Sequence, residues 1–301
     1  MTAPSVAILG VNGMLGHKLF QHLRDRFPST TGLMRGDADR APLQNVNLLN
    51  GPDVLTKIDA TDFDFVRKQL KRLRPDFVVN AIGIVKQKDE AKELLPSIAV
   101  NAYLPHLIAS ILAEWGGRLI HVSTDCVFSG HRGDYRESDL TDAEDLYGRT
   151  KALGETSEPN ALTLRTSIIG RELSGSRSLL EWFLSQRGRT VRGFSRAWWS
   201  GVSTIQLARL ILELIRDGSP LTGIYQVSSG KISKYELLLI LRDAFGVPME
   251  IVRDEEFFCD RSLDGRKFAE VTGWRSPSWQ EMAAELAADP TPYGRWRGER
   301  P

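Results

Sequence analysis

The first half of the chain alternates short apolar runs with longer amphipathic stretches. The runs have the length of buried strands, and the longer stretches repeat their apolar residues with the period of a helix. The expected strands are Val6–Leu9, Thr30–Met34, Asp76–Ile82, Arg118–Ser123 and Ala161–Arg165. The expected helices are Met14–Arg26, Phe63–Leu73, Ile98–Trp115 and one that contains Tyr147. This alternation predicts an α/β fold, a doubly wound parallel sheet with helices on both faces.

Beyond about Thr166 the pattern changes. The expected elements are helices at Leu179–Leu184, Ile205–Ile215 and Ser233–Phe245, and a strand at Gly223–Val227. The S-K-Y-E segment is a capping box, in which Ser233 and Glu236 satisfy backbone N–H groups at a helix start. We expect the strand to return to the main sheet.

This organisation predicts two discontinuous domains and a tail. Residues 1–168 and 200–230 should form the larger domain, which contains the main sheet. Residues 169–199 and 231–288 should form a smaller α/β lobe, with the substrate in the cleft between them. Residues 289–301 are rich in Pro, Gly and Arg and predict a loose C-terminal tail.

Composition and charge narrow the class of protein. The 301 residues include 39 basic and 38 acidic side chains, so the net charge of +1 indicates no nucleic-acid or membrane partner. Cys126 and Cys259 make neither a disulfide framework nor a metal motif, and no metal site is expected. Neither a signal peptide nor an apolar stretch of membrane-spanning length is apparent. We therefore expect a cytoplasmic protein.

A glycine-rich segment, G-x-x-G-x-x-G, joins the first strand to the first helix. Glycines permit a tight turn and let the backbone approach a pyrophosphate at the helix N-terminus. The expected cofactor contacts here are Gly10, Asn12, Gly13, Met14, Leu15 and Gly16. Taken alone, the motif is equally compatible with an ordinary turn. Between a strand and a helix it predicts a Rossmann-like dinucleotide site.

The residues after the second strand bear on the choice of cofactor. Arg35 stands there, and the first carboxylate is Asp37. An arginine can pair with the 2′-phosphate of NADPH, whereas an acidic residue grips the ribose of NADH. We expect NADPH, and the alternative is that Asp37 binds the ribose of NADH while Arg35 is a surface residue.

Further cofactor contacts are expected at the next two strand ends. Asp59, followed by Ala60, is suited either to accept a hydrogen bond from an adenine amino group or to cap a helix. Asn80, Ala81 and Gly83 follow the third strand, where ligands bind in open α/β sheets. We expect them near the inner ribose of the cofactor.

Three residues form the candidate catalytic set. Tyr147 and Lys151 are four residues apart and share one face of a helix. A phenol has a pKa of about 10, and a neighbouring ammonium lowers it toward a useful range. Thr124 ends a strand and offers a hydroxyl to a substrate carbonyl. A Y-x-x-x-K pair alone is usually a surface pair, so the prediction depends on all the motifs together.

These segments together resemble the extended short-chain dehydrogenase/reductase superfamily, and more closely its dTDP-4-dehydrorhamnose reductase branch. The resemblance covers residues 1 to about 230 and rests on G-V-N-G-M-L-G, N-A-I-G, H-V-S-T-D-C-V-F-S-G, Y-R-E-S-D, L-Y-G-R-T-K-A-L-G-E and L-T-L-R-T-S. It implies NADPH-dependent reduction of a nucleotide-linked 4-keto-6-deoxy sugar for cell-surface polysaccharide precursors. Thr124, Tyr147 and Lys151 would be the catalytic residues, and Tyr147 would protonate the C4 oxygen. The implied partner is a small-molecule nucleotide sugar, and a homodimer is kept open.

The chain departs from this branch in three places. N-A-I-G-I-V-K-Q-K-D replaces the usual N-A-A-A-Y-T-x-V-D, which brings Lys86 or Lys88 near the sugar pocket. Cys126 stands where related dehydratases carry a glutamate, which disfavours dehydration. The segment Arg171–Trp199 also follows its own course.

The segment Arg171–Trp199 leaves the nucleotide open. Its arginines at 171, 189 and 192 are suited to a diphosphate. Its tryptophans at 182, 198 and 199 are suited to a base, although core packing is expected for at least two of them. A UDP-linked N-acetylated sugar is therefore an alternative substrate.

Two other functions stay open. An epimerase of the same superfamily would oxidise and re-reduce its substrate with no net use of cofactor. A non-catalytic NADP-binding regulatory subunit would bind a partner enzyme instead of turning over a sugar.

Overall fold

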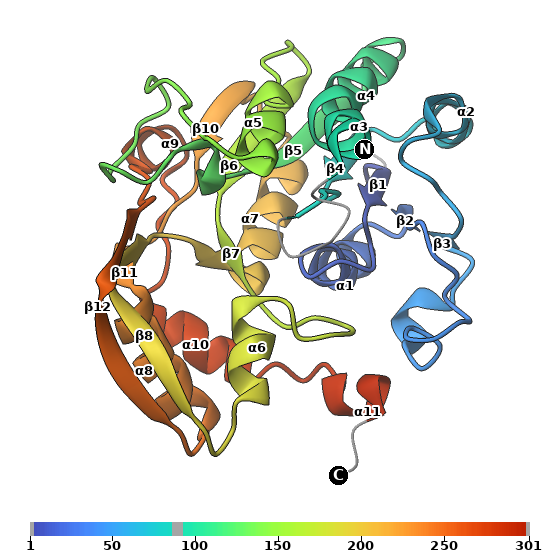
Figure 1. The fold of residues 1–301 in the computed structure, drawn as a ribbon. Helices are drawn as coiled ribbons and strands as arrows, with labels where there is room; N and C mark the ends of the chain where they lie inside the picture. The colour runs from blue at the N-terminus through green and yellow to red at the C-terminus, as the bar shows by residue number, and fades with distance from the viewer. Residues whose placement is uncertain (1–2, 86–92, 299–301) are drawn as a thin grey trace.

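The computed structural model describes residues 3–85 and 93–298, so Lys86 and Lys88 lie outside the described residues. Its centre is a seven-stranded parallel sheet (Figure 1). The strands are β1 (Val6–Leu9), β2 (Thr30–Leu33), β3 (Val54–Leu55), β4 (Phe77–Asn80), β5 (Arg118–Thr124), β6 (Ala161–Thr166) and β10 (Gly223–Gln226). Their order is β10-β6-β5-β4-β1-β2-β3, which confirms the α/β fold and places β10 at one edge.

Both faces of the sheet are buried, as the continuous apolar strands predict. Val6 and Ile8 of β1 belong to one hydrophobic cluster, and Ala7 and Leu9 belong to another. Successive side chains of a strand point to opposite faces, so one short strand contributes to both clusters. Helices α1 (Gly16–Arg26) and α7 (Thr204–Arg216) supply the first cluster, while α2 (Phe63–Leu73) and α4 (Leu104–Ala113) supply the second.

The strand order reverses between β1 and β4. From β1 the chain continues to β2 and β3 on one side, and β4, β5 and β6 follow on the other. Ligands of open α/β sheets bind outside the carboxyl ends of the strands at such a switch point. The segments after β1, β4 and β5 therefore converge on the expected ligand position.

The expected helix at Ile98–Trp115 is part of a longer, interrupted one. It consists of α3 (Leu94–Ser97), a π-helical segment η3 (Ile98–Tyr103) and α4. Contrary to expectation, Leu94–Ala113 is long and apolar enough to cross a membrane by length and composition alone. More than half of it, 56%, is buried inside the protein, as in the core helix of a globular domain.

The second half of the chain adds a three-stranded sheet that the sequence pattern did not reveal. Its strands are β8 (Thr190–Trp199), with β11 (Ile232–Ser233) and β12 (Glu250–Asp260) on either side. Along β8 buried and more exposed positions alternate. The outward positions carry Thr190, Arg192 and Arg196 as well as two aromatic residues, so the strand has no continuous apolar run.

Helices and two very short strands complete the second half. The helices are α5 (Leu146–Leu153), α6 (Leu179–Ser185), α8 (Lys234–Phe245), α9 (Arg266–Thr272), α10 (Trp279–Ala287) and α11 (Tyr293–Arg297). β7 (Ile168–Ile169) pairs with β9 (Val202–Ser203). The expected capping box is present at α8, where the Ser233 and Glu236 side chains each bond the backbone of the other.

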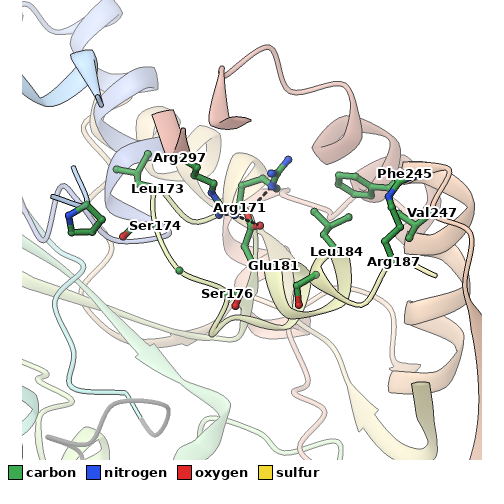
Figure 2. A pocket seen from close by; sticks show the side chains of 13 residues that line it. Arg171, Leu173, Ser174, Ser176, Glu181, Leu184, Arg187, Phe245, Val247 and Arg297 are labelled. Atoms are coloured by element: carbon green, nitrogen blue, oxygen red, sulfur yellow. Dashed lines mark hydrogen bonds and ion pairs between the residues drawn. The ribbon is translucent and has the colours of Figure 1, made fainter. Parts of the chain in front are cut away.

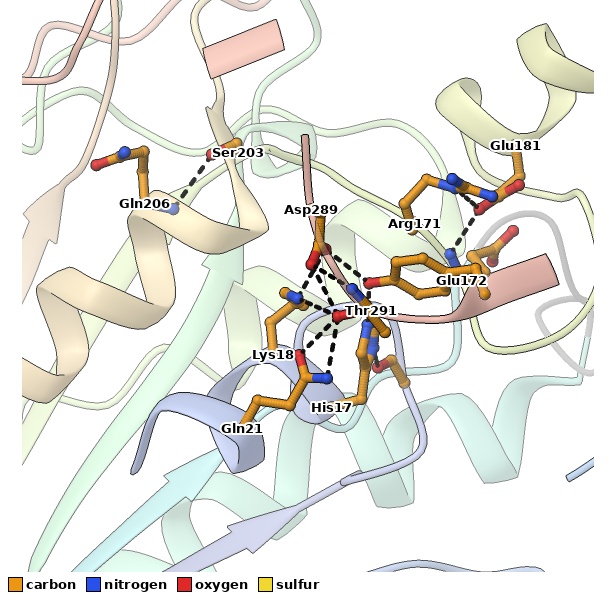
Figure 3. A network of polar contacts seen from close by, with 12 residues as sticks. His17, Lys18, Gln21, Arg171, Glu172, Glu181, Ser203, Gln206, Asp289 and Thr291 are labelled. Atoms are coloured by element: carbon orange, nitrogen blue, oxygen red, sulfur yellow. Dashed lines mark hydrogen bonds and ion pairs between the residues drawn. The ribbon is translucent and has the colours of Figure 1, made fainter. Parts of the chain in front are cut away.

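The expected loose tail is wrong for residues 289–298. Tyr293 and Trp296 of α11 are only 3% and 5% exposed, and the Trp296 indole donates a hydrogen bond to Asn47 at 3.0 Å. Asp289 and Thr291 lie over the first turns of α1, where Lys18 bonds both of them (Figure 3). The Pro and Gly residues of the segment 289–298 are typical of a linker. However, the rings of Tyr293 and Trp296 pack in the first hydrophobic cluster and hold the segment on the domain.

We predict that Trp296→Ala lowers the free energy of unfolding by about 3 kcal/mol, the usual cost of removing a buried aromatic side chain. Trp182→Ala is the matched control, because that ring is 36% exposed. Urea denaturation at pH 7 measures both. Equal, small losses in the two variants would show that the tail does not pack on the domain.

Candidate active site

The glycine-rich segment forms a cradle between β1 and α1. Gly10 has φ +84°, which side chains disfavour, and a Cβ on Gly16 would lie 1.9 Å from the Gly10 carbonyl oxygen. Only glycine at both positions lets the helix begin this close to the strand end. Asn12, Gly13 and Met14 are half-buried at the rim of the turn.

The N-terminus of α1 is suited to an anion. It has no side-chain cap, and its first turn contains no acidic residue. The backbone N–H groups of His17 and Leu19 bond the Gly13 and Leu15 carbonyls, at 3.1 and 2.9 Å. The other N–H groups of this turn and the positive end of the helix dipole are suited to a phosphate. A cradle that a Cβ would fill and an uncapped helix start together fit a dinucleotide pyrophosphate.

Arg35 and Asp37, the two residues after β2 that could distinguish NADPH from NADH, have different surroundings. Asp37 lies 3.4 Å from the Lys57 ammonium and 3.5 Å from the Arg40 guanidinium. Arg35 is exposed, and its charge helps to lower the pKa of Asp59, after the larger effect of hydrogen bonds from Thr61. Arg35 and Asp59 therefore lie at the same edge, while Asp37 is engaged by two cations.

Asp59 is not the cap of α2. Asp62 accepts the hydrogen bond from Phe65 N at 2.9 Å and caps that helix, so the alternative role for Asp59 is wrong. Asp59 instead accepts bonds from the backbone and hydroxyl of Thr61, and Ala60 beside it is buried.

Asn80 is turned into the interior rather than toward the ligand edge. It is fully buried, its oxygen accepts from Ile82 N at 3.2 Å, and its amide nitrogen lies 3.2 Å from Nδ1 of His121. It shapes the turn after β4, so we do not expect its side chain to contact a ribose. The backbone of Ala81 abuts the cradle, since a Cβ on Gly10 would lie 3.2 Å from its oxygen. Gly83 lies further along the same turn, opposite the Asn101 amide.

Helix α5 packs directly on the segment that follows β5. A Cβ on Gly148 would lie 2.2 Å from the Cys126 carbonyl oxygen, so only glycine permits this approach. The adjacent Tyr147 thereby reaches Thr124, whose side chain is hydrogen-bonded to it. The Thr124 hydroxyl also donates to Asp125 and accepts from Cys126 N, each at 3.1 Å.

Lys151 is buried one turn further along α5. Its ammonium donates to the Val122 carbonyl at 2.8 Å and lies 3.4 Å from Nε2 of His121. Burial lowers the pKa of Lys151 to about 8, against the opposing charge of Glu155. The lysine therefore sits at β5 beside the tyrosine, held by a backbone oxygen.

The expected tuning of Tyr147 by Lys151 is wrong for this structure. Burial raises the pKa of the phenol well above its usual range, with a further rise from the charge of Cys126. The hydrogen bond with Thr124 opposes this rise without cancelling it. Tyr147 therefore keeps its proton at neutral pH, which is the state that a proton donor needs.

Comparison with known proteins identifies the family. The family model described as RmlD substrate binding domain matches residues 4–290. The chain belongs to the RmlD family.

Two curated relatives show the range of this RmlD-family chain's similarities. A dTDP-4-keto-6-deoxy-D-glucose reductase of Streptomyces niveus is 27% identical over 298 residues, covering 96% of this chain and 92% of the relative. Methionine adenosyltransferase 2 subunit beta of Danio rerio is 25% identical, covering 81% of this chain and 74% of the relative.

Among solved structures, a dTDP-4-dehydrorhamnose reductase of Bacillus anthracis in complex with NADP has the same fold. The TM-score is 0.76 at 20% identity, and the match covers 94% of this chain and 98% of that one. The fold predicted from the sequence is thus that of the RmlD family.

A cavity of about 640 Å³ opens beside α6 (Figure 2). Arg171 and Arg297 line it, and both form ion pairs with the buried Glu181 at 2.6 Å. Of the three arginines considered for a diphosphate, only Arg171 lines this cavity. Arg192 pairs with Asp254 and Glu256 of β12, and the Arg189 guanidinium contacts Gln186.

The three tryptophans considered for stacking on a base, at 182, 198 and 199, differ in burial. Trp199 is buried and stacks on Trp279 with ring centroids 4.9 Å apart. Trp198 is half-buried, and Trp182 is exposed. Core packing thus accounts fully for one of the three, rather than for the two that we expected.

Sequence reasoning missed two cations that the smaller lobe brings to the site. Lys234 lies 3.9 Å from the centroid of the Trp199 ring. Burial raises the pKa of Asp125, and the charge of Lys234 opposes that rise. Arg261 donates to the backbone oxygens of Phe128 and Ser129 at 2.9 and 3.1 Å. The one available signal was Lys234 itself, because a cation in the first turn of a helix opposes the helix dipole.

We predict that Lys151→Met raises the free energy of unfolding at pH 7 by about 1 to 3 kcal/mol, because a buried ammonium is costly. The folded lysine has a pKa of about 8, against 10.5 for an unperturbed one. Between pH 8 and 10.5 the unfolded chain binds more protons than the folded protein, so the free energy of unfolding of the wild type rises with pH. The difference in stability between Lys151→Met and the wild type should therefore shrink as the pH rises. Urea denaturation at pH 7, 8.5 and 10 measures this difference. Exposed Lys68→Met is the control, and the same pH trend there would contradict the assignment.

Proposed function

We propose that the protein is an NADPH-dependent reductase of a nucleotide-linked 4-keto-6-deoxy sugar. One observation carries the proposal: a neutral phenol, Tyr147, bonded to the Thr124 hydroxyl at the carboxyl end of β5. A ketone oxygen placed between these hydroxyls would meet both a proton donor and a second hydrogen bond. The relative from Streptomyces niveus, a reductase by name, supports the reaction class.

The reaction needs one hydride and one proton. A nicotinamide cofactor bound at the cradle of Gly10, Gly13 and Gly16 would supply the hydride for the carbonyl carbon. Tyr147 gives its Oη proton to the carbonyl oxygen, so the C=O group becomes CH–OH. Thr124 would hold that oxygen by a hydrogen bond. The ammonium of Lys151, which is on the same helix face as Tyr147 and is held by the Val122 carbonyl, would bind a ribose hydroxyl of the cofactor.

The cofactor would lie across the carboxyl ends of the strands at the switch point of the seven-stranded sheet. Its pyrophosphate fits the cradle of Gly10, Gly13 and Gly16, and its 2′-phosphate would meet Arg35. The ion pairs of Asp37 with Lys57 and Arg40 support NADPH over NADH, because they compete with a ribose hydroxyl for that carboxylate. The nucleotide of the substrate is proposed as dTDP by similarity, with UDP as the alternative.

One comparison favours a second candidate function. The methionine adenosyltransferase subunit, at 25% identity, is by name part of another enzyme. A non-catalytic subunit of this family would bind the cofactor without turning over a sugar. The Thr124–Tyr147 pair supports catalysis instead. An epimerase differs from a reductase only in the net use of NADPH, so stoichiometry separates the two.

The test is a panel of dTDP-, UDP-, GDP- and CDP-linked 4-keto-6-deoxy sugars, followed by NADPH absorbance. We predict stoichiometric NADPH oxidation with one of them. Tyr147→Phe should lower kcat by about 100-fold or more, since it removes the proton donor, while NADPH affinity stays unchanged. The control is Tyr103→Phe, whose ring is 50% exposed. Turnover unaffected by Tyr147→Phe, or no NADPH consumption with any sugar, would sink the proposal.

We predict that Arg35 determines the preference for NADPH over NADH. Arg35→Ala should weaken NADPH binding by about tenfold or more, because a charge-assisted bond to the 2′-phosphate is lost, and leave NADH binding unchanged. Fluorescence titration measures both affinities. Arg72→Ala, which removes an exposed charge of α2, is the control. Equal weakening of both cofactors by Arg35→Ala would remove Arg35 from cofactor selection.

A further inference from the structure

His17 connects the phosphate cradle to the distant C-terminus. It stands in the first turn of α1, directly after Gly16, and its side chain is fully buried. Nδ1 lies 2.9 Å from the Gly13 carbonyl oxygen, and Nε2 lies 2.7 Å from the hydroxyl of Tyr293, which is 276 residues away in sequence.

The polarity of this chain of hydrogen bonds follows from its ends. A carbonyl oxygen only accepts, so Nδ1 must carry the proton that it donates to Gly13. Burial lowers the pKa of His17 to about 4, which keeps the imidazole neutral. Nε2 therefore accepts. The Tyr293 hydroxyl has a single proton, and it donates that proton over the shorter contact, 2.7 Å to Nε2, rather than over the 3.2 Å contact with Oδ2 of Asp289.

Tyr293 is itself held in place by a buried ion pair. Lys18 and Asp289 are both 4% exposed and meet at 2.7 Å, and Thr291 bonds both of them. Oδ2 of Asp289 lies 3.2 Å from the Tyr293 hydroxyl, and the Arg171 guanidinium lies over the ring of that tyrosine, 4.7 Å from its centroid. A buried ion pair broken on one side is costly, so the segment resists displacement.

We propose that the C-terminal segment serves the cofactor site through one residue, Tyr293, which acts through His17 to fix the peptide between Gly13 and Met14. This inference rests on the proposed cofactor site. A trans peptide unit is planar, with its C=O and N–H pointing in opposite directions. Holding the Gly13 carbonyl toward His17 therefore aims the N–H of Met14 the other way, as a preset donor for the pyrophosphate. His17 and Tyr293 are positioning residues and do not touch the cofactor.

The experiment measures dissociation constants by fluorescence titration for NADPH, NADH and adenosine 2′-monophosphate, which lacks a pyrophosphate. His17→Leu should weaken NADPH and NADH by the same factor, about tenfold, and leave adenosine 2′-monophosphate unchanged. Tyr293→Phe should weaken both dinucleotides by about threefold to tenfold. His17→Asn should rescue binding to within about threefold of wild type, because its amide can still donate to Gly13.

Trp296→Phe is the matched control, since it removes the bond to Asn47 in the same segment, keeps an aromatic ring beside Tyr293 and leaves every polar atom of the His17 chain in place. It should leave dinucleotide affinity unchanged. Weakening as large as that of Tyr293→Phe would show general loosening and overturn the inference. Unchanged affinities in both His17→Leu and Tyr293→Phe would overturn it as well. If the wild-type protein binds neither NADPH nor NADH, the proposed function itself is wrong. That result differs from one in which the wild type binds both and the variants bind equally well, which contradicts only the role of His17 and Tyr293.

Discussion

The close approach of α1 to the end of β1 is the constraint on which the remaining arrangement depends. The Gly16 backbone lies against the Gly10 carbonyl with no room for a Cβ, which places an uncapped helix start at the switch point of the sheet. The same contact positions His17 under the cradle, where the C-terminal segment reaches it. Helix, cradle and tail thus share one packing contact, so a bulkier residue at Gly16 would displace all three.

A second close contact, between α5 and the segment after β5, positions the candidate catalytic residues. Gly148 lets α5 rest on the Cys126 carbonyl, and this brings Tyr147 to Thr124. Burial then keeps the phenol protonated. A reductase uses the tyrosine as an acid, so burial favours the catalytically competent form. The pair Tyr147 and Lys151 is therefore better described as a donor beside a buried cation than as a phenolate held by an ammonium.

Buried cations are the structural cost of this site. Burial lowers the pKa of both Lys151 and Lys234 to about 8, and each is held by a group that stabilises the charge only partly, a carbonyl oxygen for one and an indole ring for the other. Such groups persist where function requires them rather than for stability. The ion pair of Lys18 and Asp289 differs, because hydrogen bonds complete its surroundings and it anchors the tail.

The sequence by itself determined what local periodicity and spacing encode. The strands and helices of the first half, the glycine cradle, the capping box at Ser233 and the shared face of Tyr147 and Lys151 all follow from residues close together in the chain. Tertiary structure alone decided the rest. β8 and β12 contain charged residues throughout and no continuous apolar run, and their pairing joins segments about 60 residues apart, as Thr190 and Glu250 show. The protonation of Tyr147, the inward turn of Asn80 and the bond from Tyr293 to His17 depend on burial and on contacts between distant segments, which no local pattern records.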